Sequence, residues 1–181
     1  MTSPPRSIVS LYADWRRYND RIVEGLRGRS ADELGLRASA DYWPIWAIAG
    51  HTAGARVYWL CSVFGEAGAE TTPFTDPAGF GWEDDLDTPR TADELVWAFE
   101  SSWRIIAGCL DRWTPAMLDR AFRRHTQRGV QMHTRQSVLL RLITHDAYHT
   151  GEISLTLGIH GRDVLDLWPP HPIAAEPGAS G

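Results

Sequence analysis

Residues 134–157 read TRQSVLLRLITHDAYHTGEISLTL and contain the most informative pattern in the chain. Side chains three and four residues apart share one face of an α-helix. One such face holds Val138, Leu142, His145, His149, Glu152 and Thr156. This face is apolar at its start and polar from its middle onward, so a helix packed on it would bury two imidazoles and a carboxyl group. Unpaired buried polar groups cost roughly 1–3 kcal/mol each, so we expect partners for them inside the fold.

Three more segments have the same helical periodicity. The expected helices cover residues 7–27, 42–64, 91–113 and 134–157. Pro44 suits the first turn of the second helix, and Thr91 with Glu94 forms a capping box at the start of the third. Strand-like alternation is rare except in residues 120–133, where Gln127-Arg128-Gly129 could turn a short hairpin. The predicted fold class is therefore all-α, a four-helix bundle.

The connection from Gly65 to Arg90 is long and rich in Gly, Pro, Thr and acidic residues. At ~3.3 Å per residue it can cross the length of a ~30 Å helix, so the second and third helices need not be antiparallel neighbours. We therefore expect a long crossover between them. We also expect a single domain over residues 1–168, followed by a flexible Pro-, Gly- and Ala-rich tail at residues 169–181.

Composition narrows the class of protein. The chain has 181 residues, of which 43% are hydrophobic and 23% charged, as in ordinary globular domains. No apolar run approaches the ~20 residues of a membrane span, and no signal peptide is evident. The 2 cysteines indicate a reducing compartment, so we expect a cytoplasmic protein. The net charge of −5 argues against a nucleic-acid partner. All 18 basic residues are Arg, which excludes lysine chemistry.

His145 and His149 are four residues apart, so both imidazoles project from one side of the helix, as two ligands of one metal ion do. His51 on the second helix offers a third ligand, although it could equally be a hydrogen-bonded core histidine. Three imidazoles suit Zn²⁺, the first expectation, or Ni²⁺, Fe²⁺ or Mn²⁺. Such a set leaves at least one coordination position open, as catalytic sites do. The other histidines are expected at the surface: His125, His133, His160 and His171.

Two acids lie close to the predicted ligands in the sequence. The carboxylate of Glu152 or Asp146 could accept a hydrogen bond from the N–H of a ligand imidazole, orient the ring and so assist catalysis. Alternatively, Asp146 is a solvated helix charge and Glu152 pairs with an Arg. A zinc-protease motif, His-Glu-x-x-His, is not met, because Asp146 occupies the position of the Glu.

Three arginines on the expected hairpin, Arg123, Arg124 and Arg128, could bind carboxylates of a substrate or thiol. Solvated loop charges are the alternative for all three. Tyr58 lies two turns beyond His51 and could either line the same pocket or pack in the core.

His51, a long connection, a capped third helix and the motif HDAYHTGEI at residues 145–153 follow one another in this chain. This arrangement resembles the DinB/YfiT-like metalloenzymes over about residues 7–168. The motif of that family is similar to H-x-x-H-H-R-G-Q. This chain keeps the two outer histidines and the glycine, and it has Tyr148, Thr150 and Glu152 in place of the middle His, the Arg and the Gln.

The resemblance implies a DinB-like bundle, often dimeric, in which the three histidines hold a divalent metal. Members of that family are similar to mycothiol- or bacillithiol-dependent S-transferases and to a mycothiol-dependent maleylpyruvate isomerase. We therefore expect an S-transferase or isomerase that acts on a small electrophile, with mycothiol or another low-molecular-weight thiol as co-substrate and a homodimer as the assembly. The alternatives are a metal-dependent hydrolase of a small substrate and a metal- or ligand-binding bundle without catalysis.

Overall fold

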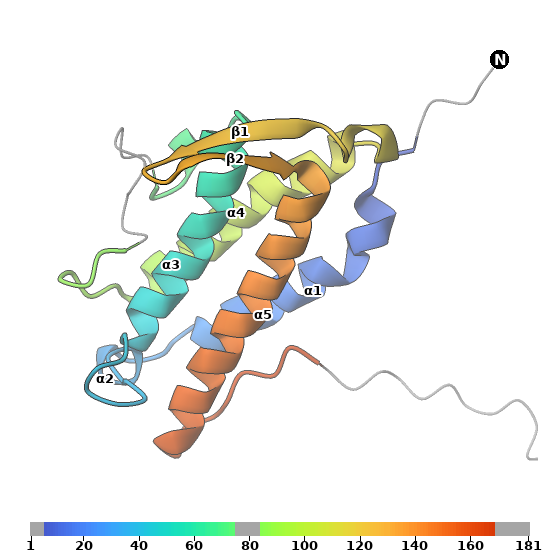
Figure 1. Ribbon diagram of the computed structural model, residues 1–181. Helices are drawn as coiled ribbons and strands as arrows, with labels where there is room; N and C mark the ends of the chain where they lie inside the picture. Colours follow the sequence, from blue (N-terminus) through green and yellow to red (C-terminus); the bar gives the residue numbers. More distant parts are fainter. Residues whose placement is uncertain (1–5, 75–83, 169–181) are drawn as a thin grey trace, which may run out of the picture.

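A computed structural model describes residues 6–74 and 84–168 as a mostly helical bundle with one small hairpin (Figure 1). The α-helices are α1 (Ala13–Leu26), α2 (Ala31–Leu34), α3 (Ile45–Val57), α4 (Ala92–Arg112) and α5 (Arg135–Ile159). Single turns of 3-10 helix form η1 (Val9–Tyr12), η3 (Ala69–Thr71) and η4 (Pro115–Met117). The predicted fold class is confirmed, whereas the tail at 169–181 lies outside the described residues. Within the described ranges, no helix is both long and apolar enough to cross a membrane.

The predicted helix over residues 42–64 differs most from its expected form. Pro44 is the N-cap residue of α3 and does not lie within its first turn. After Val57 the helix continues as a π-helical turn, η2 (Tyr58–Val63). In this turn the Phe64 N–H donates to the Trp59 carbonyl at 3.2 Å, a spacing of five residues instead of four. Thr91 does form the predicted capping box with Glu94.

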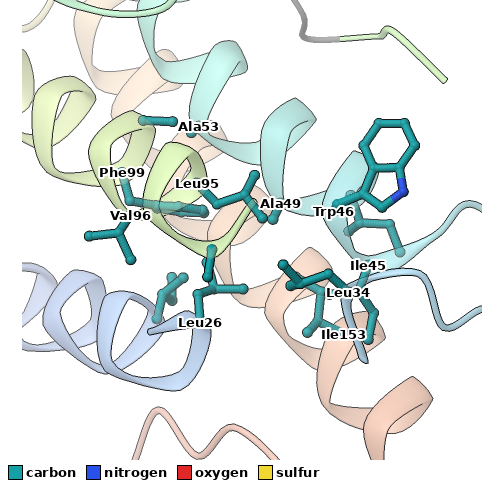
Figure 2. Packing of buried hydrophobic residues seen from close by; sticks show 14 of the residues in the cluster. Leu26, Leu34, Ile45, Trp46, Ala49, Ala53, Leu95, Val96, Phe99 and Ile153 are labelled. Atoms are coloured by element: carbon teal, nitrogen blue, oxygen red, sulfur yellow. The ribbon is translucent and has the colours of Figure 1, made fainter. Parts of the chain in front are cut away.

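Two apolar clusters show in which direction each long helix runs. One cluster joins the end of α1 and the end of α5 to the starts of α3 and α4 (Figure 2); it includes Leu26, Ile153, Ile45 and Leu95. The other cluster joins the opposite ends of the same helices; it includes Trp15, Leu139, Leu60 and Ile106. Helices α3 and α4 are therefore parallel to each other and antiparallel to α1 and α5. The chain between α3 and α4 must cross the length of the bundle, as the sequence predicted.

The hairpin lies beside the end of η2 (Figure 1). Strands β1 (Ala121–Thr126) and β2 (Gly129–Thr134) are antiparallel, with Thr126 opposite Gly129. Gly129 has a φ of 118°, which L side chains rarely adopt, so the turn requires a glycine there. Phe122 packs on Phe64 with ring centroids 4.3 Å apart, and this contact holds the hairpin against the bundle.

A polar network is buried between the two apolar clusters. Arg56 of α3 and Asp146 of α5 are only 1% and 3% exposed. The Arg56 guanidinium donates to both oxygens of Asp146, from Nε at 3.1 Å and from Nη2 at 2.8 Å. Trp15 of α1 donates its indole N–H to the same carboxylate at 2.8 Å, and Arg56 Nη1 donates to Asn19 Oδ1 at 2.7 Å. The network therefore connects α1, α3 and α5 at one level of the bundle.

Replacing Asp146 by Ala is expected to lower the free energy of unfolding by about 3–5 kcal/mol, because Arg56 would stay buried without its counter-charge. Urea denaturation followed by circular dichroism measures this loss. Asp20→Ala is the matched control, because Asp20 pairs with Arg16 in the open and should contribute about 0.5 kcal/mol or less. The double variant Arg56→Met/Asp146→Leu should recover much of the loss. Equal costs for the Asp146 and Asp20 variants would contradict this account.

Candidate metal centre

The three histidines predicted as metal ligands meet between α3 and α5, which lie side by side (Figure 1). His51 projects from α3, and His145 and His149 project one turn apart from α5. One ring nitrogen of each residue lies within 4.8 Å of those of the other two. The Nε2 atoms of His51 and His145 are 3.1 Å apart. The structure thus brings the predicted set together, with at least two of its nitrogens turned toward one another.

In two of these rings, Nδ1 lies within hydrogen-bond distance of a carboxylate oxygen. His51 Nδ1 lies 2.9 Å from Asp84 Oδ1, and His149 Nδ1 lies 2.9 Å from Glu152 Oε2. A carboxylate acceptor favours the tautomer with its proton on Nδ1, which leaves the Nε2 lone pair free for a cation. Glu152 therefore contacts a ligand imidazole, His149, as the sequence suggested. Asp84, from the long connection, makes the corresponding contact with His51.

The protonation states of the cluster also suit a metal. Burial, assisted by the neighbouring His149 and His51, lowers the pKa of His145 to about 3. Burial also lowers the pKa of His149, although the nearby Glu152 carboxylate opposes this. Both imidazoles are thus neutral near pH 7, which is the form that binds metal ions. His145 Nδ1 is buried, and no hydrogen-bond partner for it is found in residues 6–74 and 84–168.

This donor set fits a divalent transition-metal ion. Neutral imidazoles are preferred ligands of Zn²⁺, Ni²⁺ and Fe²⁺, and three protein ligands leave coordination positions open. The Nε2 atoms of His51 and His145 are 3.1 Å apart, close enough for both to bind one ion at the ~2.0–2.1 Å typical of zinc–imidazole bonds.

Asp146 does not have the role that was expected for it. Both oxygens of its carboxylate accept hydrogen bonds from Arg56, and one also accepts from Trp15, so neither is turned to an imidazole. It is also no solvated helix charge, because it is buried. Asp146 follows His145 directly, and a step of one residue turns a side chain by ~100° around the helix, away from the histidine face. Its place is in the core network.

Two grooves flank the histidine cluster. The larger, of about 610 Å³, is lined by His133, Ser137, Leu140, Arg141, Thr144, His145 and Tyr148. The smaller, of about 260 Å³, is lined by Asp41, Tyr42, Trp43, Ile48, His51, Tyr148, His149 and Glu152. Tyr148, which stands where the related motif has its middle His, lines both grooves and is largely exposed. An apolar groove of about 570 Å³ between α1, α5 and residues 164–168 contains none of the three histidines, so we place the chemistry elsewhere.

The arginines and the tyrosine proposed as substrate contacts lie at different places. Arg124 Nε donates to the Tyr58 hydroxyl at 2.8 Å, and both side chains contact the ring of Trp59, so these two residues form one unit. Arg123 and Arg128 are exposed, and Arg123 alternates with the half-buried Arg124 along β1. None of these four residues is among those that line the two grooves beside the histidines.

Three residues at the site were not identified from the sequence. His133 was expected at the surface, but it is half-buried in the larger groove, where burial and the charges of Arg141 and Arg124 lower its pKa. Arg141 could have been found, because it precedes His145 by four residues and so shares its helix face. Asp84 carries no such signal, since it belongs to a connection without periodicity.

A helical bundle with three converging imidazoles between two of its helices defines a class of proteins with a candidate divalent-metal site. Within this class the chain belongs to the DinB superfamily, because the model of that family matches residues 11–153. A DinB-like protein from Bacillus cereus ATCC 10987 has a similar structure, with a TM-score of 0.66 over 93% of this chain and 100% of the other. The two sequences are 16% identical, so this likeness shows the fold alone. A comparison with curated proteins found no match.

Metal analysis of the purified protein tests the site directly. We expect Zn²⁺ or another divalent ion bound to the wild-type chain, and little in His51→Ala, His145→Ala or His149→Ala. Glu152→Ala should keep the site but weaken its affinity by about 10–100-fold, because the imidazole loses its acceptor. His125→Ala is the control, since that side chain is exposed on the hairpin. Undiminished metal content in all three ligand variants would rule out the site.

Proposed function

We propose that the protein is a divalent-metal-dependent enzyme that uses a low-molecular-weight thiol to substitute or isomerise a small electrophile. The observation that supports this most is the set of three imidazoles whose ligand atoms lie within 4.8 Å of one another, beside grooves of about 610 and 260 Å³. A bound divalent ion would supply a Lewis acid that favours the thiolate form of a thiol. Zn²⁺ is the first candidate, with Ni²⁺, Fe²⁺ and Mn²⁺ as alternatives.

A thiol from outside the chain is favoured because the chain's own thiols are unsuitable. Burial raises the pKa of Cys61 to about 11 and that of Cys109 to about 12, so both stay protonated near pH 7. Neither cysteine lines the two grooves beside the histidines. The chain has no lysine that could act as a nucleophile instead. Mycothiol is the first thiol to test, given the family resemblance.

In the transfer reaction the S–H bond of the thiol breaks and an S–C bond forms. The leaving group departs with the electrons of its bond to carbon. Glu152 lines the smaller groove and could accept the thiol proton while its other contact keeps His149 oriented. In an isomerisation the thiol adds, the carbon skeleton rotates, and the thiol leaves again, so that it is regenerated.

Two other functions make different predictions. A metal-dependent hydrolase would place a water molecule where the thiol is proposed, and it would need no thiol. A bundle that only binds a metal or ligand would turn over neither kind of substrate. The family assignment is compatible with all three, so an activity comparison must separate them.

The metal-loaded protein should form a thioether adduct only when metal, mycothiol and a small electrophile are all present, as measured by mass spectrometry. His149→Ala should lower the rate at least 100-fold, because a ligand is lost. Cys61→Ala should retain the rate, since its thiol stays protonated. Hydrolysis of ester or amide substrates without thiol would instead favour the hydrolase, and the absence of both reactions would favour the binding protein.

We further propose that a second copy of the chain covers the apolar groove between α1, α5 and residues 164–168. Apolar side chains in this groove are unusually exposed, with Leu155 at 63% and Trp168 at 70%. Exposed apolar patches of this kind mark interaction surfaces.

Light scattering after size exclusion should therefore give the mass of a dimer for the wild-type chain and of a monomer for Leu155→Glu. Leu11→Glu is the control, because Leu11 is 70% exposed and lies outside the groove. A monomeric wild-type chain would contradict the dimer.

A further inference from the structure

Two guanidinium groups converge on one buried aromatic ring next to the histidine cluster. Arg124 of β1 places its Cζ 5.0 Å from the ring centroid of Trp59, and Arg141 of α5 places its Cζ 4.9 Å from the same centroid. Trp59 also packs edge-on against His133, with centroids 4.7 Å apart. Three segments distant in sequence, namely η2, the hairpin and α5, thus supply one basic surface.

These two charges have no carboxylate partner in the parts of the chain that the structure describes. Arg124 bonds only neutral groups there, the Tyr58 hydroxyl at 2.8 Å and Gln131 Oε1 at 3.1 Å. Several arginines elsewhere in the bundle are ion-paired with acids, among them Arg16–Asp20, Arg21–Glu24, Arg29–Glu33, Arg56–Asp146 and Arg112–Glu66. In a chain of net charge −5, two neighbouring arginines without acids are a local excess of positive charge.

The excess lies where a substrate of the histidine cluster would extend. Arg141, His133 and His145 line the same groove of about 610 Å³. Arg141 and His145 are four residues apart on α5, so their Cβ atoms are about 6 Å apart. A molecule of a few carbon atoms can therefore span the distance from the cluster to the guanidinium. Ser137 and Thr144 add hydroxyl groups to the same wall.

We propose that Arg141 and Arg124 form a carboxylate-binding subsite, and that the electrophilic substrate carries a carboxylate a few bonds from the carbon that reacts. The planar guanidinium offers two parallel N–H donors that match a carboxylate. Contact with Trp59 restrains each guanidinium before the ligand arrives, which reduces the entropy lost on binding. The role of this subsite in turnover rests on the proposed function. Its binding of anions does not depend on that function.

The binding experiment titrates maleate, succinate and, for comparison, the neutral maleamide into the full-length protein by calorimetry, both metal-loaded and after chelation. We expect the dicarboxylates to bind and maleamide not to bind. Arg141→Leu and Arg124→Leu should each weaken binding at least tenfold, with and without metal. Arg141→Lys should recover only part of the affinity, because lysine lacks the two parallel N–H donors of the guanidinium. Circular dichroism checks that Arg124→Leu still folds after losing its bond to Tyr58.

Arg123→Leu is the matched control, because Arg123 neighbours Arg124 in β1 but is exposed, and among the described residues the contact with Trp59 is made by Arg124 and not by Arg123. If Arg123→Leu weakens dicarboxylate binding equally, the loss reflects net charge alone and the subsite is overturned. Dicarboxylate binding that disappears on chelation, or that Arg141→Leu leaves unchanged, would also overturn it. Inorganic phosphate that binds more tightly than every carboxylate would replace the proposed ligand class.

The turnover experiment compares kcat/KM for a carboxylate-bearing electrophile and for its neutral amide, with metal and thiol present. Arg141→Leu should lower the first value at least tenfold and leave the second unchanged; equal loss for both substrates would contradict the proposal. If no electrophile reacts, the proposed function fails, while the binding experiment still decides the subsite.

Discussion

The paired hydrogen bonds between Arg56 and Asp146 set the register of α3 against α5. A charge buried in the core requires its counter-charge, and a slip of one residue along either helix moves a side chain by ~1.5 Å and ~100°. His51 precedes Arg56 by five residues, and His149 follows Asp146 by three. The register that joins the two charges is therefore the one that brings the imidazoles together. Trp15 adds α1 to the same level of the bundle.

The groups around the histidines differ in charge on the two sides. Asp41 and Glu152 line the smaller groove, whereas Arg141 lines the larger one. Such a division would suit the proposed reaction between a thiol, which would lose a proton, and an anionic electrophile. In that reaction the acids would face the thiol and Arg141 would face the anionic substrate. The half-buried imidazoles lie between the two.

Helical periodicity predicted the structural features that depend on a single helix. The long helices, the capping box at Thr91 and the shared face of His145 and His149 follow from spacings of three and four residues. The role of Asp146 did not follow, because its burial depends on Arg56, a partner 90 residues away. The contact of Asp84 with His51 was missed for a related reason. Nothing in the sequence of the connection specifies where the connection meets the bundle again. The basic surface on Trp59 needs the hairpin to be docked, which no local pattern encodes.

The π-helical turn that follows α3 separates two parts of one continuous helix. A turn with five-residue spacing holds one residue more than its neighbours, so the residues after it are rotated relative to those before it. His51 and Arg56 lie before the turn, and Trp59 lies inside it. Insertions or deletions at this point can thus change the direction of the Trp59 side chain while His51 and Arg56 keep their places. In evolutionary terms, the aromatic contact at Trp59 and the candidate metal ligand His51 can diverge independently within a single helix.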